Sequence, residues 1–135
     1  MNYLPLYPFM KILFSSISLF LLVVSGLLSK PDNELLKIEN AAPEKSSVKP
    51  KKTRKVLVYS HPSGFKHSSI PTGVKGLRVL AEQTQAFEAT FTLETKEFTT
   101  EGLKKYDAII FNNTTHVQKA FTEKSQRDAI LNFIK

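Results

Sequence analysis

The stretch that decides the fold runs from residue 55 to residue 77 and reads KVLVYSHPSGFKHSSIPTGVKGL. Its first part, Val56 to Tyr59, is a short apolar run of the kind found in buried strands. Polar residues follow at once, together with Pro62 and Gly64, and apolar residues at helical spacing begin near Ser69. Strand, loop and helix in this order form the first unit of a parallel α/β sheet, which binds ligands where its strands end. We therefore expect part of any functional site in the loop after Tyr59.

Two more strands are predicted downstream. Residues 87–94 alternate apolar and polar side chains, which indicates a strand near the sheet edge with one solvated face. Residues 107–112 are predicted to form the third strand, because Ala108 to Phe111 are apolar without alternation, which favours a strand covered on both faces. If this third strand lies beside the first, as in flavodoxin-like sheets, the loops that follow them face each other.

The helices are predicted from spacing and from capping residues. Ser69 is the expected N-cap of the first helix, residues 99–105 read as a short capped turn, and Thr122 is the expected N-cap of the last helix. The inner side of that last helix is expected to carry Ile130, Phe133 and Ile134. The chain reaches Lys135 within this helical pattern, so we expect an α/β domain truncated after about three strands.

The N-terminal region indicates export. Residues 12–28 are an apolar run preceded by Lys11, the layout of a secretory signal peptide. Met10 directly precedes Lys11, so either Met1 or Met10 is the start. We expect residues 1–29 to be a signal peptide or, if uncleaved, a membrane anchor, and the protein to be periplasmic or extracellular.

Residues 30–54 are rich in Lys, Glu, Ser and Pro and are predicted to be a disordered basic linker before a domain at 55–135. The chain has a net charge of +7, and its dense basic cluster lies at 49–55. Nucleic acid is not an expected partner, because that cluster has no interleaved aromatic side chain for base stacking, although salt-dependent DNA binding there is the alternative. The absence of cysteine excludes disulfides, thiol catalysis and a lipoprotein anchor within these residues.

His61 and His67 are the candidate catalytic residues. Neutral imidazole transfers protons near neutral pH and also ligates metals. A divalent metal held by these two histidines would need further ligands, from His116 or from outside the chain. A structural role in the loop and at the helix start is the third alternative and stays open beside the other two.

Polar residues at the strand ends are the candidate substrate-binding residues. Their hydroxyl and amide groups both donate and accept hydrogen bonds, which suits a carbohydrate ligand. The alternative is a turn that satisfies its own backbone. The candidates are Ser60, Asn112, Thr114, Thr115 and His116.

Two motifs resemble the ThuA-like, or trehalose utilisation, family. In that family a strand ends in a loop of the form H-x-x-G-[FY]-[RK]-H, which residues 61–67 match as HPSGFKH. Residues 103–115 are similar to the family's third strand and its Asn/Thr-rich loop. The resemblance covers 55–135 and implies a flavodoxin-like three-layer sandwich with a parallel sheet, related to class I glutamine amidotransferases. No amidotransferase Cys-His-Glu set carries over, because the chain has no cysteine.

The resemblance also implies a link to sugar metabolism. Together with the apolar segment at 12–28, it predicts an exported protein that binds or modifies carbohydrate, with the reaction left open. The alternative is a non-catalytic interaction module of a larger secreted or membrane-tethered protein.

Overall fold

The computed structural model describes residues 32–135, so the predicted signal peptide or anchor at 1–29 lies outside the described residues. Within residues 32–135, no helix combines the length and the apolar character needed to cross a membrane.

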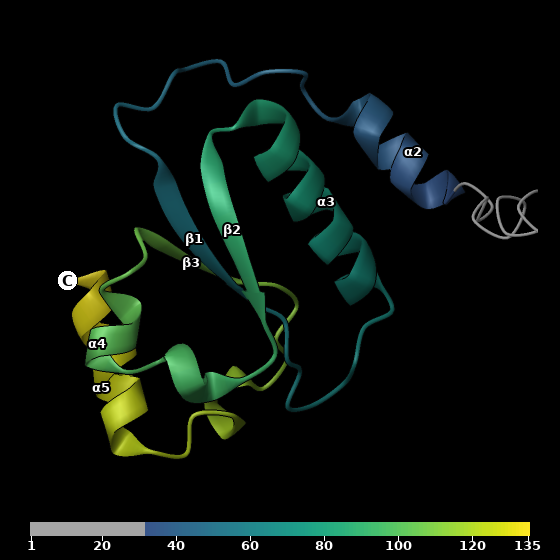
Figure 1. The fold of residues 1–135 in the computed structure, drawn as a ribbon. Helices are drawn as coiled ribbons and strands as arrows, with labels where there is room; N and C mark the ends of the chain where they lie inside the picture. Colours follow the sequence, from purple (N-terminus) through teal and green to yellow (C-terminus); the bar gives the residue numbers. More distant parts are fainter. Residues whose placement is uncertain (1–31) are drawn as a thin grey trace, which may run out of the picture. The chain divides into compact units, whose positions relative to one another are not determined.

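Three parallel strands form the sheet (Figure 1). They are β1 (Arg54–Tyr59), β2 (Phe87–Thr92) and β3 (Ala108–Phe111), in the spatial order β2-β1-β3. β1 is central and pairs in parallel with both neighbours, and its last four residues are buried. This arrangement confirms the predicted α/β fold with the first and third strands side by side, as a flavodoxin-like sheet begins.

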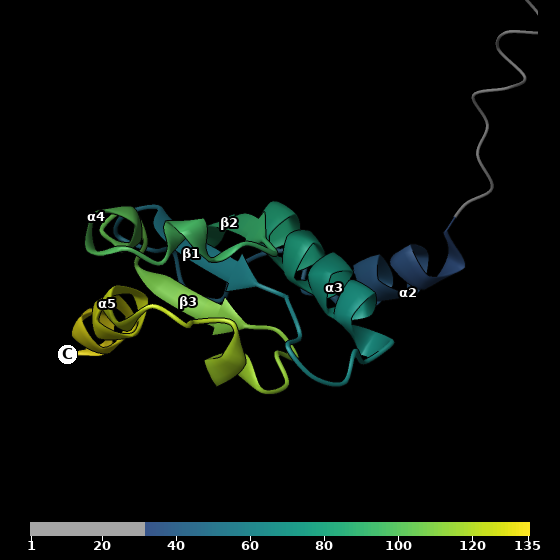
Figure 2. The same cartoon turned by 90° about the horizontal axis from the view of Figure 1, so that it is seen from below.

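Helices cover both faces of the sheet (Figure 2). α3 (Ser69–Thr84) lies on one face, and α4 (Thr100–Leu103) and α5 (Lys124–Ile134) lie on the other. Two short 3-10 turns, η1 (Thr95–Glu97) and η2 (Val117–Lys119), belong to the connections on that second side. The crossover from β1 through α3 to β2 is the βαβ unit that the opening stretch predicts.

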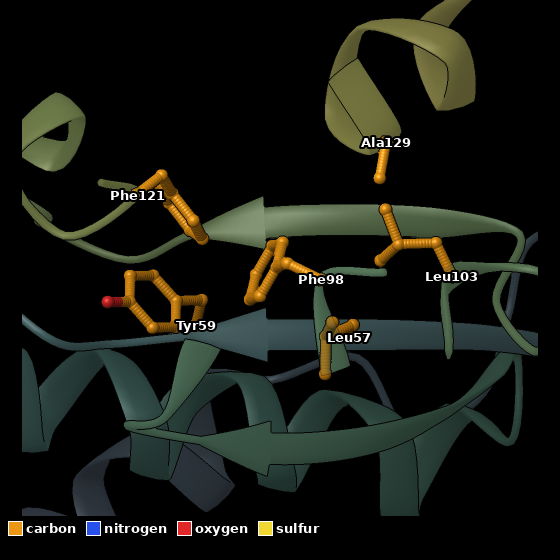
Figure 3. Close-up of a cluster of buried hydrophobic side chains, with 6 residues drawn as sticks. All are labelled: Leu57, Tyr59, Phe98, Leu103, Phe121 and Ala129. Carbon is orange, nitrogen blue, oxygen red and sulfur yellow. The ribbon is translucent and has the colours of Figure 1, made fainter. Parts of the chain in front are cut away.

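The core lies between the sheet and α5 (Figure 3). Side chains alternate along β1, so one set faces α3 and the other faces this core. Tyr59 packs edge-on against Phe98, with ring centroids 5.2 Å apart, and Phe98 packs in the same way against Phe121 at 4.7 Å. The cluster consists of Leu57, Tyr59, Phe98, Leu103, Phe121 and Ala129.

Four expectations about these helices and strands are wrong in detail. The N-cap of α3 is Ser68, and that of α5 is Glu123, one residue from the predicted cap in each case. The side chain of Ile134 is 74% exposed, and Ala129 faces the core in its place. β3 is half-buried to exposed, because within the described residues it pairs only with β1. The predicted short capped turn over residues 99–105 is confirmed, and its cap is Thr99, whose side chain accepts a hydrogen bond from Gly102 N at 2.9 Å.

Part of the predicted disordered linker is a helix. α2 (Asn33–Ala41) packs along α3, where the Glu34 carboxylate accepts hydrogen bonds from Lys75 Nζ (2.6 Å) and from the Thr72 hydroxyl. Gln83 Nε2 also donates to the Glu39 carbonyl oxygen at 3.2 Å. The local composition does not predict this helix, because the contacts that hold it come from residues about 40 positions later in the chain.

The basic cluster also has a structural role at the amino ends of the strands. Asp107 Oδ2 accepts from the backbone N of Lys55 at 2.9 Å, and Asp107 Oδ1 lies 2.7 Å from Lys52 Nζ and 3.1 Å from Arg54 Nη1. The hydrogen bond from Lys52, then that from the Lys55 backbone, hold the pKa of Asp107 far below its usual range. These contacts fasten β3 to β1 at the edge opposite the candidate site.

Candidate functional site

The loops that follow β1 and β3 meet at the carboxyl edge of the sheet. The backbone N of Ser63 donates to the Thr115 carbonyl oxygen at 3.0 Å, and Thr115 Oγ1 donates to the Phe65 carbonyl oxygen at 2.6 Å. Gly64 lies so close to the imidazole of His116 that a Cβ at position 64 would overlap the ring. The predicted meeting of the two loops is therefore confirmed, and direct contacts between them hold it.

A buried polar pair joins the ends of the same two strands. Ser60 is 3% exposed and Asn112 is 9% exposed. Asn112 Nδ2 donates to Ser60 Oγ at 3.2 Å and to the Ile70 carbonyl oxygen at 3.1 Å. Gly73 of α3 makes room for this amide, because a Cβ there would overlap Asn112 Oδ1. The amide nitrogen thus orients the Ser60 hydroxyl and fixes the start of α3.

A groove of about 710 Å³ opens beside this pair, between the carboxyl ends of β1 and β2 and the first turns of α3. One part of its lining is apolar and the other is polar or cationic. The apolar residues are Pro62, Ile70, Pro71, Val74, Phe91 and Leu93. The polar and cationic residues are Ser60, His61, Lys66, Lys75 and Thr92.

The two candidate catalytic histidines occupy different environments. His61 lines the groove next to Ser60. His67 is not among the lining residues, and its ring packs edge-on against Phe65 with centroids 4.8 Å apart. The carbonyl oxygen of His67 accepts from the backbone N of Ile70 at 3.3 Å, where α3 begins. The structure therefore places His61 at the groove and His67 at the helix start.

The loop after β3 supports the groove without lining it. Thr115 and His116 contact the loop after β1, Thr114 is half-buried, and Asn112 lies behind Ser60. Asn113 and His116 adopt left-handed backbone conformations with φ of 51° and 53°. These two turns bring the loop back against residues 63–65.

The described residues do not assemble a metal-binding cluster around the histidines. Within residues 32–135, no group of three or more His, Cys, Asp or Glu side chains is placed to hold a metal ion.

Sequence reasoning missed the contribution of β2 to the groove. Phe91, Thr92 and Leu93 line it because β2 runs parallel to β1 and ends at the same edge. The signal was present in the alternating pattern of residues 87–94, which predicts a strand beside β1. Lys66, which belongs to the same motif as His61, also lines the groove.

The hydroxyl group of Tyr59 is buried in the core on the face of the sheet that α5 covers. Its side chain is fully buried, and among the described residues its hydroxyl has no hydrogen-bond partner. Burial raises the pKa of Tyr59, because the charged phenolate would be poorly solvated there.

One comparison with known proteins gives a match. The sequence model of a family described as ThuA, trehalose utilisation, matches residues 55–135. No curated protein and no solved structure matches the chain.

Proposed function

The chain belongs to the ThuA, or trehalose utilisation, family, and we propose that the groove beside Ser60 and His61 binds a carbohydrate and presents it to the imidazole of His61. The match of residues 55–135 to this family supports a sugar-related role. The reaction class is left open between binding alone and modification of the sugar.

The observation that carries the proposal is the mixed lining of the groove. A sugar ring presents C–H groups on its faces and hydroxyl groups around its edge. The apolar wall that includes Ile70, Val74 and Phe91 suits the ring face, and Ser60 and Thr92 offer hydroxyl groups to its edge. His61 supplies a ring nitrogen that donates or accepts a proton at the same opening.

The network behind the groove gives Ser60 and Asn112 different roles. Ser60 Oγ accepts a hydrogen bond from Asn112 Nδ2, so its own proton can be directed to a ligand oxygen. Asn112 acts as a positioning residue, because its amide nitrogen is already shared between Ser60 and Ile70. Thr114, Thr115 and His116 are proposed to shape the loop that holds this arrangement.

The test compares the two histidines in the full chain. Glucose and trehalose are titrated by calorimetry against the parent protein, His61→Ala and His67→Ala, and the products are examined for sugar turnover. We expect His61→Ala to weaken binding or to abolish turnover, while His67→Ala leaves binding close to that of the parent. A folded His61→Ala variant that binds and turns over both sugars like the parent would show that the site is misassigned. Binding of a protein partner but of neither sugar would favour the interaction module.

Export remains a separate proposal, supported by the apolar run at 12–28 after Lys11. Residues 1–54 and 10–54 are fused to alkaline phosphatase, which is active only outside the cytoplasm. We expect activity from at least one fusion and its loss when Leu21 and Leu22 are both replaced by Arg. Equal activity of the Arg variant would contradict export through this segment.

A further inference from the structure

The charged side chains that line the groove, among the described residues, are all cationic. Lys66 and Lys75 line it together with His61, and no Asp or Glu is among the lining residues. The guanidinium of Arg78 lies 4.6 Å from the ring centroid of Phe91, which also belongs to the lining. A neutral sugar needs no such excess of cations, whereas an anionic ligand would be attracted by it.

The two lysines differ in how their charge is used. Lys66 is exposed at the mouth of the loop, and among the described residues it forms no ion pair. Lys75 Nζ lies 2.6 Å from Glu34 Oε2 of α2, so a carboxylate of the protein itself already occupies one side of that ammonium group. The ammonium group of Lys66 can therefore bind an anionic ligand directly, whereas that of Lys75 already forms an ion pair with Glu34 of α2.

We propose that the groove selects sugars that carry a carboxylate, such as uronic acids, with Lys66 binding the carboxylate and Glu34 of α2 competing with it for Lys75. This inference rests on the proposed function, because it assigns the substrate class of the same groove. The sugar ring lies against the apolar wall, and the carboxylate points toward the loop of Lys66. The Ser60 hydroxyl donates a hydrogen bond to the ligand at the inner end of the groove. Its oxygen already accepts a hydrogen bond from Asn112 Nδ2, so its proton is available for the ligand.

The competition at Lys75 makes α2 part of the binding site. Glu34 also accepts a hydrogen bond from the Thr72 hydroxyl, so its carboxylate is held beside α3. A ligand carboxylate that reaches Lys75 must share the ammonium group with Glu34. Removing the Glu34 charge while keeping its shape should therefore strengthen binding of an anionic sugar and leave a neutral sugar unaffected.

The experiment titrates the full chain with three probes of similar shape, namely glucuronate, the methyl ester of glucuronic acid, and glucose. In a buffer of low ionic strength we expect glucuronate to bind about fivefold more tightly than the two neutral probes, the effect of one exposed ion pair. At an ionic strength of about 1 M the preference should disappear, because screening then acts within about 3 Å. Equal affinities for glucuronate and its ester at low salt would overturn the inference.

Variants separate the lysines and the helix. Lys66→Gln should reduce glucuronate affinity about fivefold and leave glucose unchanged, whereas Lys104→Gln, the same charge change at an exposed lysine of the α4 end, should change neither. Glu34→Gln should tighten glucuronate binding, with Glu39→Gln as the matched control on α2. An unchanged affinity in Lys66→Gln, or no gain in Glu34→Gln, would overturn the corresponding part of the assignment.

The same titrations distinguish the inference from the function on which it rests. Binding of glucose and glucuronate with equal affinity, lost in His61→Ala, would retain the carbohydrate site and refute its preference for carboxylates. Binding of none of the three probes would refute both.

Discussion

Replacing Gly73 by Ala tests whether the buried polar pair holds the site together. Alanine normally stabilises the middle of a helix by about 1 kcal/mol relative to glycine. At Gly73 the added Cβ would overlap Asn112 Oδ1 and lie 3.1 Å from both Cγ and Nδ2 of the same amide. The amide is buried between Ser60 and Ile70, so it cannot turn away without losing its hydrogen bonds.

The size of the effect follows from what the displaced amide loses. Two hydrogen bonds from Asn112 Nδ2 contribute about 1 kcal/mol each, and buried groups left unpaired add a further cost. Against this loss of about 2–3 kcal/mol stands the helix-propensity gain of about 1 kcal/mol. We therefore expect Gly73→Ala to lower the free energy of unfolding by about 1–2 kcal/mol, or the melting temperature by about 4–16 °C.

The same helix supplies the matched control. Gly76 has no heavy atom within 4 Å of a Cβ built at its position, so Gly76→Ala should raise the free energy of unfolding by about 0.5–1 kcal/mol. Urea denaturation followed by circular dichroism measures both variants. In an Asn112→Ala background the clash is absent, and Gly73→Ala should become stabilising. The reasoning is refuted if Gly73→Ala stabilises the parent as much as Gly76→Ala does.

Three further changes are expected to have defined outcomes. Gly64→Ala should lower stability by about 1 kcal/mol in urea denaturation, because its Cβ would overlap the imidazole of His116, and His116→Ala should cancel the loss. Asp107→Asn should be less stable than the parent at pH 7 and equal to it in acid. The hydrogen bond from Lys52 is the first cause of the depressed pKa of Asp107, so the carboxylate stabilises the fold above the unfolded pKa of about 4, and this stabilisation is lost as the pH falls. Equal stability of the two proteins at pH 7 would contradict this. Tyr59→Phe should stabilise by about 1 kcal/mol by removing an unpaired buried hydroxyl, and it should also remove a loss of stability above about pH 10, because a raised pKa keeps the phenol neutral only in the folded state. A variant whose alkaline melting curve matches the parent would contradict the assignment for Tyr59.

The sheet was predictable because its signals are local. The run Val56–Tyr59 and the polar loop after it identify β1, and the spacing of apolar residues from Ile70 identifies α3. The parallel arrangement then follows from the order of strand, helix and strand. Because the carboxyl ends of parallel strands share one edge, the meeting of the two loops could be expected without coordinates.

The features that sequence reasoning missed depend on distant contacts. Glu34 holds α2 beside α3 by contacts with Thr72 and Lys75. No local sequence pattern connects Glu34 with these two partners. The different surroundings of His61 and His67 depend on how residues 62–66 turn, and that turn is held by contacts with Thr115 and His116. The spacing of the two histidines in the sequence does not predict which of them lines the groove.

The central position of β1 has a consequence for synthesis of the protein. The strand is made first, yet its partners follow about 30 and 50 residues later, at Phe87 and Ala108. At a translation rate of about 5–20 residues per second, the apolar run Val56–Tyr59 waits roughly 3–10 s for its second neighbour. During that interval the nascent chain offers an unpaired hydrophobic segment to any chaperone that binds such segments.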